Sequence, residues 1–271
     1  MTAAKALTIA GSDSGGGAGI QADLKTFQEL GVYGMSVLTA VTAQNTLGVQ
    51  GVYPLELEAV ERQLESIGAD LPPDAFKTGM LFSSEIIRIT AAKIAFFRWT
   101  KLVVDPVMVA KGGSPLLLEE AVAALRADLL PLAEVVTPNL PEAEILTGRA
   151  IRTLKDREEA ARSLIELGVR YAVIKGGHDE SGDNTVDLLY DGSSFTYLEA
   201  PRIATRHTHG TGCTFSAAIT AGLAKGLSVT EAVRLAKAFI QAAIEDGLEL
   251  GAGHGPTNHF AYQRRMRGER P

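Results

Sequence analysis

The feature that most constrains the fold is a regular alternation of short apolar runs with longer segments of helical periodicity. Several apolar runs, such as Leu102-Val103-Val104, do not alternate with polar residues, which is typical of strands buried on both faces. The predicted strands are 6–11, 35–43, 74–79, 101–107, 133–138, 171–176, 185–190 and 194–199. The predicted helices are 18–31, 55–68, 83–98, 117–128, 140–147, 155–168, 211–226 and 229–249. This order predicts an α/β fold with a mainly parallel sheet covered by helices.

The chain is long enough for one large domain. It has 271 residues, of which 46% are hydrophobic, and a domain of that size buries about three quarters of its unfolded surface. No internal repeat, low-complexity stretch or linker divides it, so we expect a single domain over residues 1–271. Asp191-Gly192, between two strand-like runs, predicts an antiparallel hairpin in the C-terminal third.

Charge and cysteine content exclude several classes of protein. The net charge of −6 argues against a general nucleic-acid surface or an anionic membrane partner. The basic residues Arg264, Arg265, Arg267 and Arg270 are interpreted as the solvated end of a C-terminal helix. A single cysteine excludes an internal disulfide and a multi-cysteine metal site, and it fits a reducing compartment. With no signal-peptide pattern and no run able to span a bilayer, we expect a cytoplasmic protein.

One segment, residues 207–218, combines a glycine-rich loop, the start of a helix and the only cysteine, Cys213. The unpaired N–H groups and the dipole at such a helix start favour phosphate binding. The same field is expected to lower the pKa of the thiol toward neutrality. The segment therefore predicts a phosphate cradle with a candidate base. The alternative for Cys213 is a small residue that fills the start of the helix.

Glycine-rich stretches follow several predicted strands, at residues 11–17, 111–113 and 175–177. In open α/β sheets ligands bind at the carboxyl ends of the strands, so we expect these loops to line one crevice. The first stretch is not a Walker A loop, because no Lys-Ser or Lys-Thr follows its glycines. A dinucleotide-binding interpretation is disfavoured, because the acidic residue expected about 20 positions further on is missing.

Polar residues at other predicted strand and helix ends allow two interpretations each. Asp105 ends a buried strand, where it would form a turn or reach a metal or ligand. Asn139 and Glu142 lie three residues apart at the start of a helix, so their oxygens could approach Mg²⁺ or could cap the helix. Lys175 and Lys237 are candidate phosphate partners, although Lys237 could also be an exposed helix charge.

Five motifs, in order along the chain, carry a resemblance to a known family. They are GSDSGGGAGIQAD at 11–23, DPVM at 105–108, TPNLPE at 137–142, KGGH at 175–178 and HGTGC at 209–213. Together the chain resembles the ribokinase-like fold and, within it, the bacterial hydroxymethylpyrimidine/phosphomethylpyrimidine kinases of thiamine biosynthesis. The resemblance implies a three-layer α/β/α sandwich. It also implies ATP- and Mg²⁺-dependent phosphorylation of 4-amino-5-hydroxymethyl-2-methylpyrimidine to its monophosphate and then to the diphosphate.

The resemblance also implies roles for individual residues. Asp23 and Gln44 would hydrogen-bond to the pyrimidine, and Gly11, Met80 and Val107 would line its pocket. Gln44 suits an aminopyrimidine edge, because its amide donates and accepts on adjacent atoms.

On the nucleotide side, Asn139 and Glu142 would organise Mg²⁺-ATP, and Gly210, Thr211 and Gly212 would form the anion hole with Cys213 as the catalytic residue. The implied nucleotide-binding residues are Asp105, Lys175, Thr208 and Lys237, and Lys111-Gly112-Gly113 would belong to a mobile flap.

Cys213 narrows the resemblance within the fold. Most ribokinase-like sugar kinases have an aspartate base at this position, whereas the pyrimidine kinases and some related enzymes that act on pyridoxal have cysteine. A pyridoxal kinase is therefore one alternative, and a non-catalytic pyrimidine or nucleotide sensor is another. An apolar helix face is consistent with a homodimer, and the expected partner is otherwise a small-molecule substrate.

Overall fold

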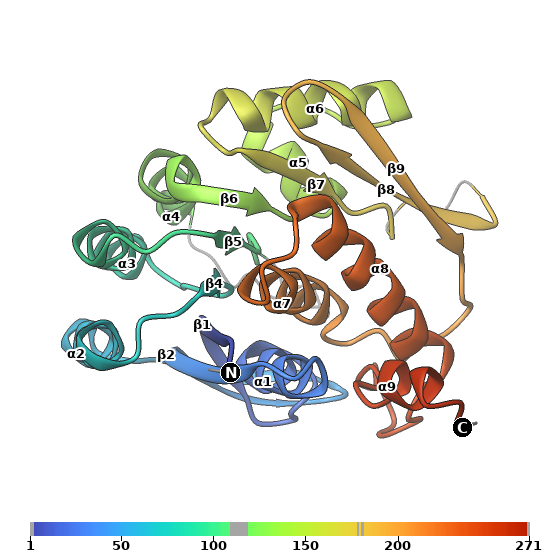
Figure 1. Ribbon diagram of the computed structural model, residues 1–271, viewed down its shortest axis with the longest axis horizontal. Coiled ribbons are helices and arrows are strands. Elements are labelled where there is room, and N and C mark those ends of the chain that lie inside the picture. The colour runs from blue at the N-terminus through green and yellow to red at the C-terminus, as the bar shows by residue number, and fades with distance from the viewer. Residues whose placement is uncertain (1–2, 109–118, 178, 180–181, 270–271) are drawn as a thin grey trace.

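The computed structural model describes residues 3–108, 119–177, 179 and 182–269. In this part of the chain nine strands form one sheet, in the order β3-β2-β1-β4-β5-β6-β7-β8-β9. Helices cover the sheet on both sides (Figure 1). The predicted three-layer α/β/α sandwich with a mainly parallel sheet is confirmed.

The centre of the sheet is parallel and buried on both faces. It consists of β1 (Lys5–Asp13), β2 (Tyr33–Asn45), β4 (Ala75–Thr78), β5 (Leu102–Val104), β6 (Ala133–Val136) and β7 (Tyr171–Ile174). Val103 and Val104 are neighbours that point to opposite faces, and both are fully buried. The non-alternating apolar runs of the sequence are thus explained by helices on either side.

Antiparallel strands lie at both edges. β8 (Asn184–Tyr190) and β9 (Phe195–Pro201) form the predicted hairpin, whose turn contains Gly192 at φ +90°. β3 (Gly48–Pro54), which pairs with β2, was not predicted. Its two glycines and its proline give it no apolar run, and it tolerates them because an edge strand bonds along one side only.

Each face of the sheet has its own hydrophobic core. One core is formed with α2 (Leu57–Asp70), α3 (Ser84–Phe97), α4 (Glu119–Ala124), α5 (Leu140–Thr147) and α6 (Leu154–Glu166). The other is formed with α1 (Gly19–Glu29), α7 (Thr211–Ala224) and α8 (Val229–Glu245), with α9 (Ala261–Met266) packed beside them. Within α7 every residue from Thr214 to Leu223 is buried, so this helix is fixed firmly against the sheet.

The C-terminal helix agrees with the expectation for the basic tail. α9 carries Arg264 and Arg265 in its last turn, and both side chains are exposed. Arg265 pairs with Asp246 at the end of α8. Among the described helices none combines the length and the apolar character needed to cross a membrane.

Candidate active site

Two loops from distant parts of the sequence meet at the carboxyl end of β1. The loop after β1 and the loop before α7 touch backbone to backbone, because a Cβ added at Gly210 would lie 1.7 Å from the carbonyl oxygen of Gly17. A third segment joins them, since the backbone N–H of His209 donates to the carbonyl of Gly255 at 3.0 Å and His209 also forms a bridge with Pro256. The same segment reaches the β2–β3 turn, where His254 N–H donates to the Thr46 carbonyl at 2.8 Å.

The start of α7 is open. Its N-cap residue Gly210 has φ +81° and no side-chain cap hydrogen bond. Thr211, Gly212 and Cys213 form the first turn and are partly accessible. A Cβ on Gly212 would lie 3.3 Å from the Lys175 ammonium. Uncapped N–H groups beside a cation form a site that suits a phosphate group.

Cys213 lies where the starts of α1 and α7 meet. Burial raises the pKa of its thiol to about 12, and the carboxylates of Asp23 and Asp105 add to this rise. Lys77 and the backbone N–H of Gly19 act in the opposite direction. The prediction that the helix field lowers this pKa is therefore wrong, because the loss of solvent outweighs the dipole. In the ligand-free protein the group is a neutral thiol.

A buried ion pair lies beneath Cys213. Lys77 Nζ donates to Asp23 Oδ1 at 2.8 Å, and Thr8 Oγ1 donates to Asp23 Oδ2 at 2.6 Å. Both members of the pair are fully buried. Without a ligand, both oxygens of Asp23 are bonded within the protein and its side chain has no exposed surface, and its assignment to ring binding stays a prediction. Asp23 also holds Lys77, a lysine in the buried strand β4 whose role the sequence alone did not reveal.

Lys175 brings two predicted acidic residues together. Its ammonium lies 3.1 Å from Asp105 Oδ1 and 3.9 Å from Glu142 Oε2. Ser216 in α7 donates to the other Asp105 oxygen at 3.2 Å. Burial raises the pKa of Glu142 to about 7, since the nearby Lys175 offsets only part of the cost and Asp105 adds repulsion. The cluster therefore places one lysine and two carboxyl groups beside the open start of α7.

Asn139 and Glu142 form a capping box at the start of α5. Asn139 Oδ1 accepts from the Glu142 N–H at 2.9 Å, and Glu142 Oε2 accepts from the Asn139 N–H at 2.8 Å. The helix-cap interpretation is thus realised in the structure. No group of three or more His, Cys, Asp or Glu side chains suited to a metal occurs in the described ranges. The carboxylates of Glu142 and Asp105 nevertheless offer the hard oxygen donors that Mg²⁺ takes alongside water and phosphate.

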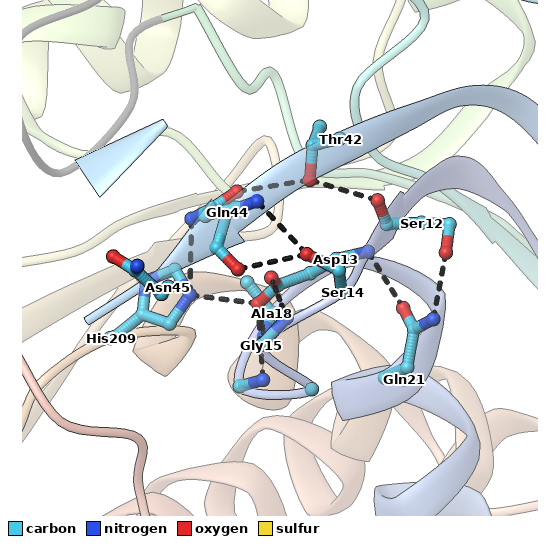
Figure 2. Close-up of polar contacts among 12 residues, drawn as sticks. Ser12, Asp13, Ser14, Gly15, Ala18, Gln21, Thr42, Gln44, Asn45 and His209 are labelled. Carbon is cyan, nitrogen blue, oxygen red and sulfur yellow. Dashed lines mark hydrogen bonds and ion pairs between the residues drawn. The ribbon is translucent and has the colours of Figure 1, made fainter. Parts of the chain in front are cut away.

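Gln44, at the end of β2, belongs to a polar cluster that Figure 2 shows. Its amide nitrogen lies 3.2 Å from His209 Nε2, and the same histidine nitrogen lies 2.9 Å from Asp13 Oδ2. Asp13 also accepts from the backbone N–H groups of Gly15, Gly17 and Ala18 at 2.8, 3.0 and 2.9 Å. Burial opposes the charge of Asp13, but the hydrogen bonds from His209 and the backbone lower its pKa below the usual value.

The remaining predicted residues lie around these clusters. Gly11 and Met80 pack together, since a Cβ on Gly11 would meet Met80 Cε at 2.3 Å, and Val107 is partly exposed just after Asp105. Thr208 is partly exposed one residue before His209, and its carbonyl accepts from the Thr211 N–H at 3.3 Å.

Lys237 is ion-paired with Asp187 at 2.7 Å. Asp187 also accepts from the Gly176 N–H at 2.7 Å, which links Lys237 to the loop that carries Lys175. A surface hollow of about 410 Å³ lies between β9 and α8 and has Lys237 in its lining. Lys111-Gly112-Gly113 and His178 fall outside the described residues.

Comparisons with known proteins find relatives along nearly the whole chain. The family model described as phosphomethylpyrimidine kinase matches residues 13–258. The chain is 55% identical over 264 residues to a Bacillus subtilis hydroxymethylpyrimidine/phosphomethylpyrimidine kinase, with 97% of each chain covered. It is 54% identical to a Geobacter sulfurreducens thiamine biosynthesis bifunctional protein, ThiED, over 94% of this chain and 52% of that protein.

Solved structures give the same fold. An ADP complex of Bacillus subtilis pyridoxal kinase matches with a TM-score of 0.90 and 48% identity, covering 96% of this chain and 98% of that chain. A Clostridium difficile phosphomethylpyrimidine kinase matches with a TM-score of 0.80 and 45% identity, covering 89% of this chain and 99% of that chain.

Proposed function

The chain belongs to the phosphomethylpyrimidine kinase family, and we propose that its crevice performs both phosphorylations of thiamine biosynthesis. The hydroxyl of 4-amino-5-hydroxymethyl-2-methylpyrimidine attacks the γ-phosphorus of ATP, a new O–P bond forms, and the bond to ADP breaks. The monophosphate then accepts a second phosphoryl group to give the diphosphate. The observation that carries this proposal is the open start of α7, where the Lys175 ammonium lies beside Gly212 and Cys213 follows in the same turn.

The anion hole supplies most of the catalysis in this proposal. Phosphoryl transfer has a loose transition state, so positioning and charge neutralisation dominate the rate enhancement. The N–H groups of Gly212 and Cys213, in the first turn, face developing negative charge without a competing side-chain cap, whereas the Thr211 N–H donates to the Thr208 carbonyl. Lys175 adds a positive charge beside Gly212.

Cys213 orients the attacking hydroxyl. Its thiol is neutral before substrate binds, because burial raises its pKa to about 12. A neutral thiol keeps its own proton and cannot accept a second one. The hydroxyl proton therefore leaves late, after the new O–P bond has begun to form, and passes to an oxygen of the transferred phosphoryl group, which a loose transition state permits.

Oxygen ligands for magnesium are available beside the nucleotide side of the crevice. Glu142 and Asp105 would hold Mg²⁺ through their carboxylates and bound water, whereas the side chain of Asn139 is engaged in the cap of α5. When bound, the ion neutralises charge on the ATP phosphates. Lys175, Thr208 and Lys237 are assigned to the same nucleotide.

The substrate side is assigned to Gln44 as the reader of the ring, with Gly11, Met80 and Val107 around it. The packing of Met80 on Gly11 supports this, because it leaves the methionine at the end of β1 where Gln44 also lies. A second function, phosphorylation of pyridoxal, is favoured by one observation. Solved pyridoxal kinases match this chain at 48% and 43% identity with TM-scores near 0.90.

We also propose that the protein is a cytoplasmic homodimer. The single cysteine and the use of ATP support the location. Exposed apolar side chains on the β2–β3 hairpin, namely Val41, Leu47 and Tyr53, support self-association. Light scattering after gel filtration tests the dimer, and a monomeric mass at micromolar concentration would contradict it.

The deciding experiment is a coupled ADP-release assay with Mg-ATP. It compares hydroxymethylpyrimidine, its monophosphate and pyridoxal, with reactions lacking each substrate as controls. Turnover of the two pyrimidines, with diphosphate identified as the product, is the expected result. Turnover of pyridoxal alone would contradict the pyrimidine proposal, and failure with all three substrates would overturn the kinase proposal itself.

A further inference from the structure

Asp13 and His209 form a pair that contacts Gln44, the side chain proposed to bind the substrate ring (Figure 2). We propose that Asp13 and His209 are positioning residues that fix which end of the Gln44 amide faces the anion hole, and so direct the hydroxymethyl group of the substrate toward it. This inference rests on the proposed function, and it adds two residues that the sequence did not single out as functional.

The first step is to identify whether Nε2 of His209 carries a proton. Asp13 Oδ2 lies 2.9 Å from His209 Nε2, and Asp13 is only 3% exposed. The ionised carboxylate can only accept hydrogen bonds, so Nε2 must carry the proton in this contact. Asp13 is itself held in place by three backbone N–H groups of the glycine-rich loop. The histidine therefore presents a donor, not an acceptor, at Nε2.

The second step is the orientation of the Gln44 amide. The two ends of an amide have nearly the same shape, so hydrogen bonds decide which is which. With the nitrogen facing His209 at 3.2 Å, two N–H donors oppose each other. At the other end, the Thr42 hydroxyl donates to the Ser12 carbonyl at 2.9 Å, which leaves an acceptor toward Gln44. A half-turn of the amide removes this conflict, because the oxygen then shares the Nε2 proton with Asp13 and the nitrogen donates to Thr42 Oγ1.

The third step follows from the substrate. Once His209 and Thr42 occupy the outer hydrogen-bonding positions of the amide, one lone pair and one N–H remain side by side for the ring. The exocyclic amine of the substrate donates and its adjacent ring nitrogen accepts. The amine then lies on the His209 side, and the neighbouring hydroxymethyl carbon lies further in that direction, on the side of the loop in which His209 directly precedes Gly210. The reversed amide would turn the hydroxymethyl group away from the anion hole.

The test compares two substitutions of one residue. In His209→Gln the amide nitrogen reaches about as far as Nε2 and can donate to both Asp13 and Gln44, whereas in His209→Asn it reaches only as far as Nδ1. We expect His209→Asn to lower kcat/KM for hydroxymethylpyrimidine about 10- to 100-fold, the effect of losing a hydrogen bond to a charged group. His209→Gln should retain most of the activity. The KM for ATP and the melting temperature should be similar in the two variants.

Two controls separate positioning from folding. Asp191→Asn alters an aspartate that caps the β8–β9 turn through Ser193 and Ser194 without a histidine partner, and it should leave activity unchanged. A substrate analogue without the 4-amino group should be a poorer substrate, and His209→Asn should then cause little additional loss. Equal losses with both substrates, or equal activity of the Gln and Asn variants, would overturn the inference. Failure of the unmodified protein to phosphorylate hydroxymethylpyrimidine would instead overturn the proposed function.

Discussion

The starts of α5 and α7 face the same crevice but are built in opposite ways. α5 begins with a capping box in which Asn139 and Glu142 satisfy each other's backbone N–H groups. α7 begins at Gly210, in the left-handed conformation and without a side-chain cap. Lys175 lies between them, 3.9 Å from Glu142 and beside Gly212. The closed start anchors a helix, whereas the open start keeps its donors free for a ligand.

The largest loss of activity is expected when the open start of α7 is altered by Gly210→Ala. We expect activity to fall about 100- to 1,000-fold, because the anion-hole donors lose their position. The free energy of unfolding should also fall by at least about 1–2 kcal/mol, the cost of the left-handed conformation for a residue with a Cβ. Steady-state kinetics and thermal melting measure the two effects.

The matched control for this variant is Gly148→Ala, at the end of α5. Gly148 is also left-handed, with φ +69°, but a Cβ there would meet nothing within 4 Å. It should lose about 1–2 kcal/mol of stability, less than Gly210→Ala, whose Cβ also meets the Gly17 carbonyl, and it should keep its activity. Equal loss of activity in the two variants would contradict the special role of the α7 start.

Cys213→Ala removes the side chain of the open start to which the proposal assigns the reacting hydroxyl. We expect kcat to fall about 100-fold, because the hydroxyl loses the group that aligns it with the γ-phosphorus. ADP binding measured by calorimetry should be unchanged. A kcat within a few-fold of the unmodified protein would mean that Cys213 only fills the start of the helix.

Glu142→Gln tests the charge at the capped start of α5, because glutamine can keep the capping box while removing the charge. The pKa of Glu142 is about 7 in the folded protein against a usual 4.5. The folded state therefore binds the extra proton between these values, and this carboxyl makes stability fall as pH rises from about 4.5 to 7. Urea unfolding without Mg²⁺ should show a flatter pH profile for the variant over this range, and an unchanged slope would contradict the assignment.

The same variant should weaken the use of Mg-ATP. Loss of one carboxylate that would hold the ion is expected to raise the KM for Mg-ATP about tenfold. An initial-rate titration of Mg-ATP at pH 8 measures this effect with Glu142 ionised in the unmodified protein. An unchanged KM would remove Glu142 from the metal assignment.

The smallest effect is expected for Asn139→Ala, which opens the start of α5 and leaves the charge of Glu142 in place. Loss of an N-cap costs about 1 kcal/mol of stability. Activity should change less than in Glu142→Gln, because the Asn139 side chain already bonds to the helix. A larger loss of activity than in Glu142→Gln would show that Asn139 itself acts on the metal or the nucleotide.

The sequence predicts the layers of this protein well, because strands such as β5 and helices such as α5 depend on local patterns. α5 begins and ends at the predicted residues, 140 and 147, since Asn139 and Gly148 mark its two boundaries. β3 could not be predicted in the same way. Its glycines and Pro54 are tolerated only because the strand lies at an edge of the sheet, and that position depends on the tertiary arrangement.

The candidate site was only partly predictable, because its electrostatics depend on contacts across the chain. The dipole of α7 predicts a more acidic thiol at Cys213, but burial has the larger effect. The pairs Asp23–Lys77 and Asp13–His209 join residues 54 and 196 positions apart. No spacing rule connects such residues, so their roles appear only when the sheet places them together.

The contact of Gly17 with Gly210 and Pro256 also sets an order of events during synthesis. The glycine-rich loop leaves the ribosome first, whereas the anion hole follows nearly 200 residues later and rests on Pro256. An unfinished chain can therefore fold its first strands and helices without assembling the phosphate site. The phosphate site of the emerging polypeptide can therefore form only when nearly all of the chain has been translated.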